Sequence, residues 1–345
     1  MSQVINSLKS ICIIRLSSIG DVTHMIPIIN TLKHFSPNTD ITWIIGKTEY
    51  TLVKNIKNIK FIIVDKKNIF GSIKLLLSLR KEKIFDILLH MQVSLRSNLL
   101  SLFVKANRKI GYNQSLSKNF HSLFNKEKID CHKNPHVIET FFCFLKKIGI
   151  KDKKLDWSIK LDNPKDIINL KGIKYIVINP FTSSRRLNYR EWDIDNYKNI
   201  TDYIFNKYGI ESIIVGGKTY YEKKKSEKIC DKEFIHNLVG KTDLQQLCNI
   251  IKDCEFYIGP DSGTLHLATM LSKPVIGLYA TSNPYRTGPY NNMDFVINKY
   301  PDALMKYKKK RVSGVNWGER IRNKNAMSLI TEEDIKDKVG KILGF

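Results

Sequence analysis

The chain has 345 residues, 42% of them hydrophobic, which suffices for two cores of ordinary domain size. No stretch approaches the roughly 20 consecutive apolar residues of a membrane span, so the sequence excludes a membrane-spanning protein. The formal net charge of +24 favours anionic partners, but lysine, isoleucine and asparagine are abundant along the whole chain. The charge therefore indicates a compositional bias more than a local basic patch.

The six cysteines form no CxxC pair and no zinc-like spacing, and several lie in apolar runs where they pack as small core residues. Residues 1–10 lack the basic start and apolar stretch of a signal peptide. We therefore expect a cytoplasmic protein with reduced cysteines, whose contact with a membrane is peripheral. The histidines show no HExxH or comparable pattern, so neither a metal nor another cofactor is expected.

Apolar runs of strand length alternate with segments of helical period, which is typical of parallel sheets covered by helices. In the first half we predict strands at residues 11–16, 41–45, 61–64 and 86–89, and helices at 22–35, 72–81 and 95–104. Pro27 is expected near the first turn of its helix, where proline is tolerated. The polar stretch 156–172, with Pro164, predicts a connection between two domains.

The alternation then restarts. We predict strands at residues 175–179, 212–215, 255–258 and 274–279, and helices at 194–208, 220–230, 244–251, 264–271 and 331–342. The last helix has Thr331 as a capping residue and acidic residues in its first turn. It is expected to pack back towards the first domain.

The strand at 255–258 leads through an Asp-Ser-Gly turn into a helix. The backbone N–H groups of Ser262, Gly263 and Thr264 open that helix without intrahelical partners, and the helix dipole adds positive charge there. The junction can therefore hold a phosphate, with Asp261 beside it. His266 lies one turn further on, where a structural role and a ligand role both stay open.

A second strand-to-helix junction follows residues 11–16, where a small turn runs into Asp21. One interpretation is that Asp21 caps the helix, which stabilises by about 0.5–2 kcal/mol. The other is that its carboxylate accepts a proton from an incoming hydroxyl, because open α/β sheets bind ligands at the carboxyl ends of their strands. Two such junctions, far apart in sequence, predict one cleft between two α/β domains.

The loop after the strand at 175–179 combines hydroxyl groups with three arginines. Guanidinium groups and hydroxyls suit phosphate oxygens, although a solvated loop with incidental charge has the same composition. Trp192, at the end of this loop, is predicted to be a packing anchor. The phosphate-binding candidates in the loop are Ser183, Ser184, Arg185, Arg186 and Arg190.

Five segments, taken together and in order, resemble glycosyltransferase family 9, the ADP-heptose:lipopolysaccharide heptosyltransferases of Gram-negative bacteria. They are residues 15–27, 190–192, 238–242, 259–268 and 286–290. The resemblance implies the GT-B fold, in which two Rossmann-like domains face each other across a central cleft. It implies an acceptor-binding domain at 1–165, a nucleotide-sugar-binding domain at 166–330 and a C-terminal helix at 331–345.

The resemblance also implies an inverting, metal-independent reaction in which Asp21 is the general base. It leaves open which of the three loop arginines meets the donor diphosphate. The residues implied to bind the donor are Ser183, Ser184, Arg190, Asp261, Ser262, Gly263, Thr264 and His266.

Acceptor binding is expected from the first domain, because basic residues suit the carboxylates of the acidic sugar Kdo and the phosphates of lipid A. A generic lysine-rich surface is the alternative interpretation for any one of them. The expected acceptor residues are Ser18, Gly20, Gln92, Arg96 and Arg108, with Lys105, Lys109 and Lys118 nearby.

The function implied is heptose transfer from ADP-heptose to the Kdo-lipid A inner core of lipopolysaccharide, at the anionic cytoplasmic face of the inner membrane. Alternatives are a heptose acceptor, as in heptosyltransferase II, and another nucleotide sugar. Nucleic-acid binding is a remote alternative, because the sequence contains no recognition helix, stacking platform or RNA-binding motif. A dehydrogenase is disfavoured because the first turn lacks the GxGxxG spacing.

Overall fold

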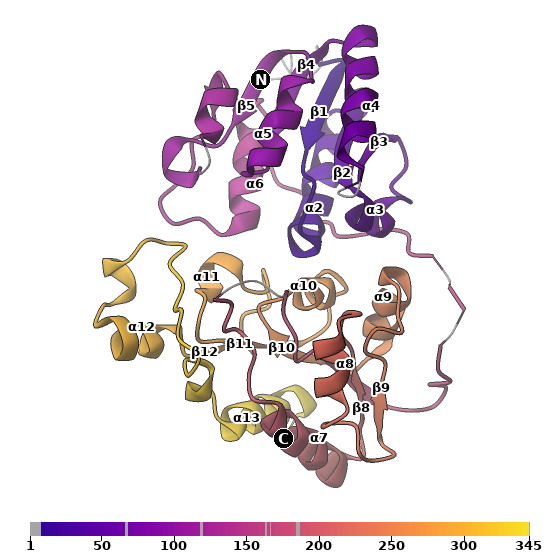
Figure 1. The fold of residues 1–345 in the computed structure, drawn as a ribbon, viewed down its shortest axis with the longest axis vertical. Coiled ribbons are helices and arrows are strands. Elements are labelled where there is room, and N and C mark those ends of the chain that lie inside the picture. Colours follow the sequence, from indigo (N-terminus) through magenta and orange to yellow (C-terminus); the bar gives the residue numbers. More distant parts are fainter. Residues whose placement is uncertain are drawn as a thin grey trace. The chain divides into compact units, whose positions relative to one another are not determined.

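The computed structural model divides into two compact units, Met1–Lys160 and Leu161–Phe345. It describes residues 8–65, 68–117, 120–162, 164–165, 167–183 and 187–344. Each unit contains a six-stranded parallel sheet covered by helices, so the α/β class is confirmed (Figure 1). The division falls inside the stretch predicted to connect the domains, five residues before the expected boundary at 165. The described residues at 151–173 form neither helix nor strand.

The first unit has the strand order β3-β2-β1-β4-β5-β6. Its strands are β1 (Ser10–Ile14), β2 (Asp40–Gly46), β3 (Ile59–Val64), β4 (Phe85–His90), β5 (Ala106–Gly111) and β6 (Glu127–Lys128). Its helices are α2 (Ile19–Phe35), α3 (Lys47–Val53), α4 (Ile69–Glu82), α5 (Leu95–Leu102) and α6 (Val137–Lys147). Two 3₁₀ turns, η1 (Gln114–Leu116) and η2 (His121–Phe124), lie between β5 and β6.

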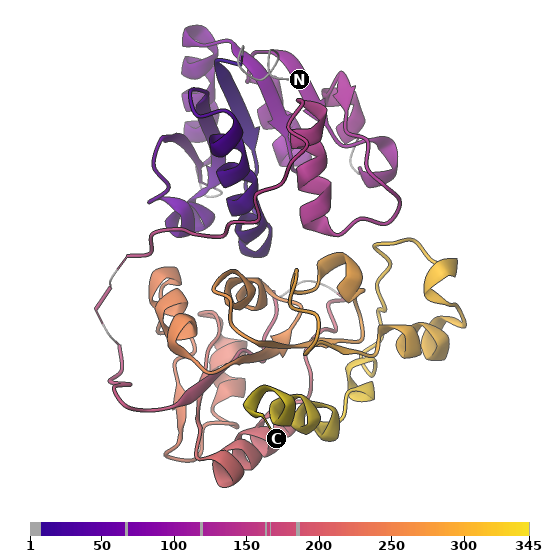
Figure 2. The same cartoon turned by 180° about the vertical axis from the view of Figure 1, so that it is seen from behind.

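Helices cover both faces of this sheet. Ile73 of α4 and Leu100 of α5 pack into one apolar cluster with Ile14 and Leu88 of the central strands, so α4 and α5 share a face. Helices α2 and α6 pack together and cover the other face (Figure 2). Because β1 lies between β2 and β4 in parallel register, the segments that follow these strands meet at one edge of the sheet.

The second unit has the strand order β12-β11-β10-β7-β8-β9. Its strands are β7 (Tyr175–Ile178), β8 (Glu211–Ile214), β9 (Ile235–Asn237), β10 (Tyr257–Pro260), β11 (Val275–Tyr279) and β12 (Ile297–Asn298). Its helices are α7 (Ile194–Tyr208), α8 (Tyr220–Ser226), α9 (Leu244–Asp253), α10 (Gly263–Met270), α11 (Pro284–Thr287), α12 (Tyr300–Lys308) and α13 (Glu332–Leu343). The 3₁₀ turns η3 (Val312–Gly314) and η4 (Met327–Leu329) precede α13.

The C-terminal helix α13 packs within the second unit, where the sequence led us to expect a return towards the first domain. Ile335 and Val339 are fully buried in the same cluster as Tyr197 of α7 and Ile276 of β11. Figure 2 shows α13 lying beside α7. The apolar side of α13 is therefore buried in the core of its own unit.

Helix α2 begins earlier than predicted, and this changes the position of two residues. Its first residue is Ile19, with Ser18 as the N-cap, so Asp21 lies in the first turn. Pro27 consequently lies in the helix interior, whereas we expected it near the first turn. A proline there removes one backbone hydrogen bond from the helix.

The structure pairs Cys131 with Cys143 of α6 as a disulfide, so the expectation of six reduced cysteines is wrong for these two. Their Cα atoms are 5.9 Å apart, within the range of ordinary disulfides. Cys12, Cys248 and Cys254 are buried free thiols, as predicted for small core residues. In the described part of the chain, no helix has both the length and the apolar character to cross a membrane.

A buried histidine pair joins α5, β4 and η2 in the first unit. His121 Nδ1 lies 2.9 Å from Asn98 Oδ1 of α5, and the Tyr112 backbone N–H donates to His121 Nε2 at 3.2 Å. His90 Nδ1 lies 3.3 Å from Asn125 Oδ1. Burial lowers the pKa of His90 to about 3 and that of His121 to about 4, so both are neutral at pH 7.

The buried histidine pair predicts that the folded protein loses stability as the pH falls. In the unfolded chain each histidine takes up a proton near pH 6.5, while the folded form resists it down to pH 3–4. The free energy of unfolding should therefore fall below pH 6.5, by about 2 kcal/mol per histidine at pH 5. Urea denaturation at pH 7 and pH 5 measures this loss.

The double variant His90→Gln/His121→Gln should be less stable at pH 7 and should lose less between pH 7 and pH 5. The variant of an exposed histidine, His132→Gln, serves as the control and should keep the native slope. An equal slope in all three proteins would contradict the assignment of acid sensitivity to the buried pair.

Candidate functional site

In the first unit, the turn after β1 orients Asp21 at the start of α2. The Asp21 Oδ2 atom accepts hydrogen bonds from the backbone N–H and the side-chain hydroxyl of Ser18, both at 3.1 Å. It also pairs with the Arg15 guanidinium. The side chain of Asp21 remains 29% exposed. Asp21 thus caps its helix. Because these contacts all involve Oδ2, capping does not exclude a role for the carboxylate in proton transfer.

Arg15 is buried where the carboxyl ends of three neighbouring strands meet. Its backbone N–H donates to the Ile44 carbonyl of β2 at 3.1 Å, and its NH1 group donates to the Met91 carbonyl after β4 at 2.6 Å. The guanidinium lies over the Phe141 ring of α6, 4.9 Å from its centroid. These contacts fix the cation beside Asp21.

The charge of Asp21 follows from two opposing effects. Burial favours the neutral acid and raises the pKa, whereas the Arg15 cation and the hydrogen bonds from Ser18 favour the carboxylate and lower it. The second effect is larger, so the pKa of Asp21 lies below its ordinary value of 3.8. The Asp21 side chain is therefore ionised at neutral pH.

Gln92 holds the turn from the other side. Its Oε1 atom accepts from the backbone N–H groups of Leu16 and Ser17 at 2.5 and 3.2 Å, and its Nε2 group donates to Ser17 Oγ at 3.2 Å. Gln92 therefore positions the Ser17-Ser18 turn. Ser18 itself is exposed, while Gly20 is buried with its carbonyl bonded to Thr23 Oγ1.

The other residues expected to bind the acceptor are placed differently. Arg96 is exposed on α5. Arg108, on β5, forms two 2.8 Å hydrogen bonds with the Glu127 carboxylate. Those bonds raise the pKa of Arg108 and lower that of Glu127. Arg108 is thus engaged within the protein, which leaves Arg96 as the better candidate of the two for an acidic acceptor. Lys118 lies outside the described residues.

In the second unit, α10 begins directly after β10, which is the strand-to-helix junction that the sequence predicted. Ser262 is the N-cap and its Oγ accepts from the Leu265 N–H at 3.4 Å. Thr264 Oγ1 accepts a 2.8 Å hydrogen bond from Asn179, the residue that follows β7. Ser262, Gly263 and Thr264 are all partly accessible. Their backbone N–H groups are available in a helix-start geometry that favours phosphate oxygens.

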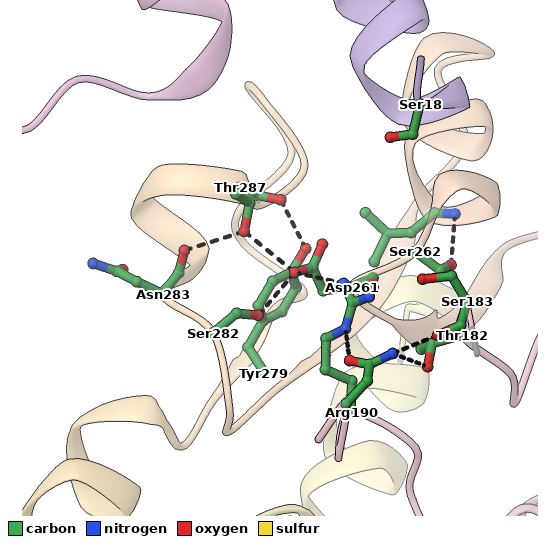
Figure 3. Close-up of polar contacts among 12 residues, drawn as sticks. Ser18, Thr182, Ser183, Arg190, Asp261, Ser262, Tyr279, Ser282, Asn283 and Thr287 are labelled. Atoms are coloured by element: carbon green, nitrogen blue, oxygen red, sulfur yellow. Dashed lines mark hydrogen bonds and ion pairs between the residues drawn. The ribbon is translucent and has the colours of Figure 1, made fainter. Parts of the chain in front are cut away.

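Arg190 crosses from the loop after β7 to this junction. Its NH1 group donates to the Asp261 carbonyl at 2.6 Å and lies 3.2 Å from Asp261 Oδ2 (Figure 3). Its Nε group donates to Asn188 Oδ1 at 2.7 Å. Both charged side chains are largely buried, at 12% and 8% exposure. The structure thus brings Arg190 together with the helix start, as predicted.

Two hydroxyl groups that our sequence analysis did not assign hold Asp261 from the far side. Ser282 Oγ donates to Asp261 Oδ2 at 2.9 Å, and Thr287 Oγ1 lies 3.5 Å from the same oxygen (Figure 3). Both belong to the segment after β11, the strand next to β10. Thr287 is part of the 286–290 segment. Its position after a strand was the feature of the sequence that could have identified it as a site residue.

The remaining residues that the sequence analysis named in this unit are His266, the serines and arginines of the loop after β7, and Trp192. His266 is buried with Nε2 3.9 Å from Asp261 Oδ1. Ser183 is exposed beside Asn188, whose Nδ2 donates to the Ser183 carbonyl at 2.7 Å. Ser184, Arg185 and Arg186 lie outside the described residues. Trp192 is buried and donates to the Ile330 carbonyl at 3.0 Å, which confirms it as a packing anchor.

Metal-binding side chains do not gather in the part of the chain that the structure describes: no group of three or more His, Cys, Asp or Glu residues there could hold an ion. Positive charge at the second-unit site is supplied by Arg190 and the start of α10.

Sequence comparison places the chain in a family. Residues 73–314 match the model of glycosyltransferase family 9 (heptosyltransferase). The lipopolysaccharide core heptosyltransferase OpsX of Haemophilus influenzae is 35% identical over 343 residues, which cover 97% of this chain and 97% of that protein. The chain belongs to glycosyltransferase family 9. The lipopolysaccharide heptosyltransferase 1 of Campylobacter coli, 24% identical, matches 97% of this family 9 chain and 99% of its own length.

Solved structures share the fold of this family 9 chain. The glycosyl transferase family 9 protein of Veillonella parvula superposes with a TM-score of 0.76 at 21% identity, covering 99% of both chains. Escherichia coli heptosyltransferase WaaC with ADP superposes with a TM-score of 0.74 at 17% identity, covering 96% of this chain and 99% of WaaC. The GT-B fold is confirmed, and the chain is a glycosyltransferase.

The buried pair in this family 9 protein predicts a stability effect. Arg190→Met would leave the Asp261 carboxylate buried without its cation, which should lower the free energy of unfolding by about 3 kcal/mol. The double variant Arg190→Met/Asp261→Asn should lose less than the single variant, because no unpaired charge stays buried. Urea denaturation followed by circular dichroism measures both.

Arg322→Met, at an exposed arginine of the same unit, is the matched control and should change stability little. A loss below about 1 kcal/mol for Arg190→Met, the size expected for an exposed ion pair, would contradict the burial of this pair.

Proposed function

We propose that the chain transfers heptose from ADP-heptose to the Kdo-lipid A inner core of lipopolysaccharide. Family membership and the names of its relatives support heptosyl transfer to lipopolysaccharide. Relatives named heptosyltransferase 1, 2 and 3 all match the chain, so the acceptor depends on the site. Kdo-lipid A carries carboxylates and phosphates, which suit the exposed Arg96 and the basic surface of the first unit.

The observation that carries the proposed mechanism is the fixed, partly exposed carboxylate of Asp21. An ionised carboxylate, 29% exposed and fixed by Arg15 and Ser18, has the charge and the access that a general base requires. The hydrogen bonds and the ion pair of Asp21 involve Oδ2, and we propose that Oδ1 accepts the proton of the acceptor hydroxyl. As the hydroxyl oxygen attacks the anomeric carbon, its proton passes to Asp21 and the bond to the ADP oxygen breaks. Attack opposite the leaving group inverts the anomeric centre.

The leaving ADP gains negative charge, which the second unit's residues are proposed to stabilise. The N–H groups of Ser262, Gly263 and Thr264 and the α10 dipole provide fixed donors. Arg190 uses Nε and NH1 within the protein, so we assign NH2 to the diphosphate. Asp261, held by Ser282, orients Arg190. In this scheme no metal ion is required, and Ser183 and His266 border the donor.

Replacement of the base tests the reaction directly. Asp21→Asn keeps the shape of the side chain but cannot take up the proton, so turnover should fall roughly 10²- to 10⁴-fold. ADP release from ADP-heptose is measured with delipidated Kdo-lipid A, with and without a metal chelator. ADP binding, assigned to the second unit, should be unchanged in the variant.

Asp40→Asn, at an exposed carboxylate with 77% side-chain exposure, is the control and should keep native turnover. Release only with a heptosylated acceptor would move the proposal to a heptosyltransferase II-like reaction. Loss of turnover in chelator would contradict metal independence.

The pH dependence of turnover tests the role of Arg15. In Arg15→Met the burial of Asp21 is no longer opposed by the guanidinium, so the pKa of the base should rise by about 1–3 units. The acid limb of the kcat/KM profile should move up by the same amount, because the base must be ionised in the free enzyme. Arg15→Lys keeps a cation and should restore most of the native profile. An unmoved acid limb in Arg15→Met would contradict the proposed pairing.

The acceptor is a lipid, so we further propose that the chain works at the anionic cytoplasmic face of the inner membrane as a peripheral protein. The net charge of +24 supports attraction to an anionic surface.

A further inference from the structure

One side of the first unit exposes large apolar side chains in an ordered arrangement. Leu95, Leu99 and Leu102 lie on one side of α5 and are 59%, 49% and 49% exposed. Phe120 and Leu123, at the adjoining turn η2, are 76% and 79% exposed. Helix α5 packs against η2, so we treat these five side chains as one surface, the α5–η2 face.

The apolar side chains of this face are not part of the hydrophobic core. The spacing of four and three residues places the leucines together on one side of α5, whereas Leu100 of the same helix is buried in the cluster under the sheet. Single exposed leucines are common on soluble proteins, but a contiguous group marks a surface that contacts a protein or a membrane. The arrangement therefore indicates a docking surface.

The charged residues in the sequence segment that carries the face are almost all positive. Residues 91–128 contain seven Lys or Arg and one acidic residue, Glu127. Glu127 is paired with Arg108, so it does not offset the others. Arg96, Lys105, Lys126 and Lys128 are exposed. An apolar centre with a basic border is complementary to an anionic bilayer, which offers phosphate groups at its surface and acyl chains beneath them.

The face is firmly connected to the turn that carries Asp21. Ser94 caps α5, and Ser97 Oγ in its first turn donates to the Gln92 carbonyl at 2.8 Å. The side chain of Gln92 in turn bonds to Leu16 and Ser17. The apolar face thus begins next to the residues that we expect to meet the acceptor.

We propose that the α5–η2 face docks the first unit on an anionic lipid bilayer, with the leucines and Phe120 entering the boundary between headgroups and acyl chains. The proposal rests on the proposed function only in that a lipid acceptor gives the docking its purpose. A second copy of the chain is a poorer occupant, because it would bring two basic borders together without acidic partners.

The test uses the full chain and vesicles of phosphatidylglycerol and phosphatidylethanolamine without lipopolysaccharide. The native chain should bind these vesicles, bind phosphatidylcholine vesicles at least about tenfold more weakly, and lose binding as salt is raised. The triple variant Leu95→Gln/Leu99→Gln/Leu123→Gln should bind the anionic vesicles at least about tenfold more weakly. All three side chains are exposed, so folding should be unaffected, and circular dichroism checks this.

Met305→Gln is the matched control. Met305 lies on α12 of the second unit, is 48% exposed and has Lys306 and Lys308 as neighbours, so it also combines an apolar side chain with positive charge. This variant should bind vesicles like the native chain. Equal binding by the native chain and the triple variant, or no binding by the native chain, would overturn the proposal. So would dimerisation in sedimentation that the triple variant abolishes, because the face would then belong to a second copy.

Turnover of delipidated Kdo-lipid A separates this proposal from the proposed function. The triple variant should keep native turnover with that soluble acceptor, since no bilayer is involved. If vesicle binding depends on the face but the native chain does not turn over, docking stands and the proposed reaction fails. If turnover is present but the triple variant binds vesicles as well as the native chain does, only the docking proposal fails.

Discussion

The parallel pairing of β1 with both β2 and β4 places Arg15 among three strand ends, and the conformation of the proposed acceptor site depends on how that cation is held. Its partners come from separate parts of the chain: Ile44 and Met91 supply carbonyls, and Phe141 supplies a ring. A buried guanidinium without such partners would be costly. Once it is fixed, its attraction and the hydrogen bonds from Ser18 together outweigh the effect of burial on the pKa of Asp21 and keep the carboxylate ionised.

The two strand-to-helix junctions contain the same pair of charged residue types, but the two pairs serve different purposes. Each has an aspartate at a helix start beside an arginine, Asp21 with Arg15 and Asp261 with Arg190. Asp261 is only 8% exposed and also accepts from Ser282, so its carboxylate is engaged in holding Arg190 in place. Asp21 is 29% exposed. Accessibility therefore favours Asp21, not Asp261, as the residue that exchanges a proton with an acceptor.

The sequence predicted the parts of the fold whose signal is local. Buried apolar strands such as β1 and β7 and the long amphipathic helix α7 were predicted close to their observed bounds. The strand β5 was missed because half of its sequence, ANRKIG, is polar, and this segment forms a strand through its pairing with β4. The strands β6, β9 and β12 have only two or three residues, too few for a periodic pattern.

The helices α3, α6, α11 and α12 were missed as well. Helix α6 carries a clear apolar side, but it lies between the two runs of alternating strands and helices that predicted the two domains.

The candidate site divides in the same way. Asp21 and the start of α10 closely follow apolar strands, so strand ends indicated these two positions, whereas Arg190 was singled out among three loop arginines by the resemblance to family 9. Ser282 was not found because its role depends on β11 lying next to β10. The pairing of Arg108 with Glu127 could not be foreseen either, since it requires β5 and β6 to be neighbours. Contacts between strands that are separated in sequence are set by sheet order, which a single sequence does not display.

The buried histidine pair gives the apolar face of the first unit a fixed shape. Asn98 on the buried side of α5 is bonded to His121 of η2, and Asn125 donates to the His121 carbonyl at 2.9 Å. The turn that presents Phe120 and Leu123 is therefore held against α5 by polar contacts in the interior. A surface that is already ordered loses little conformational entropy when it binds. Five exposed side chains can then bind usefully, although α5 has only eight residues.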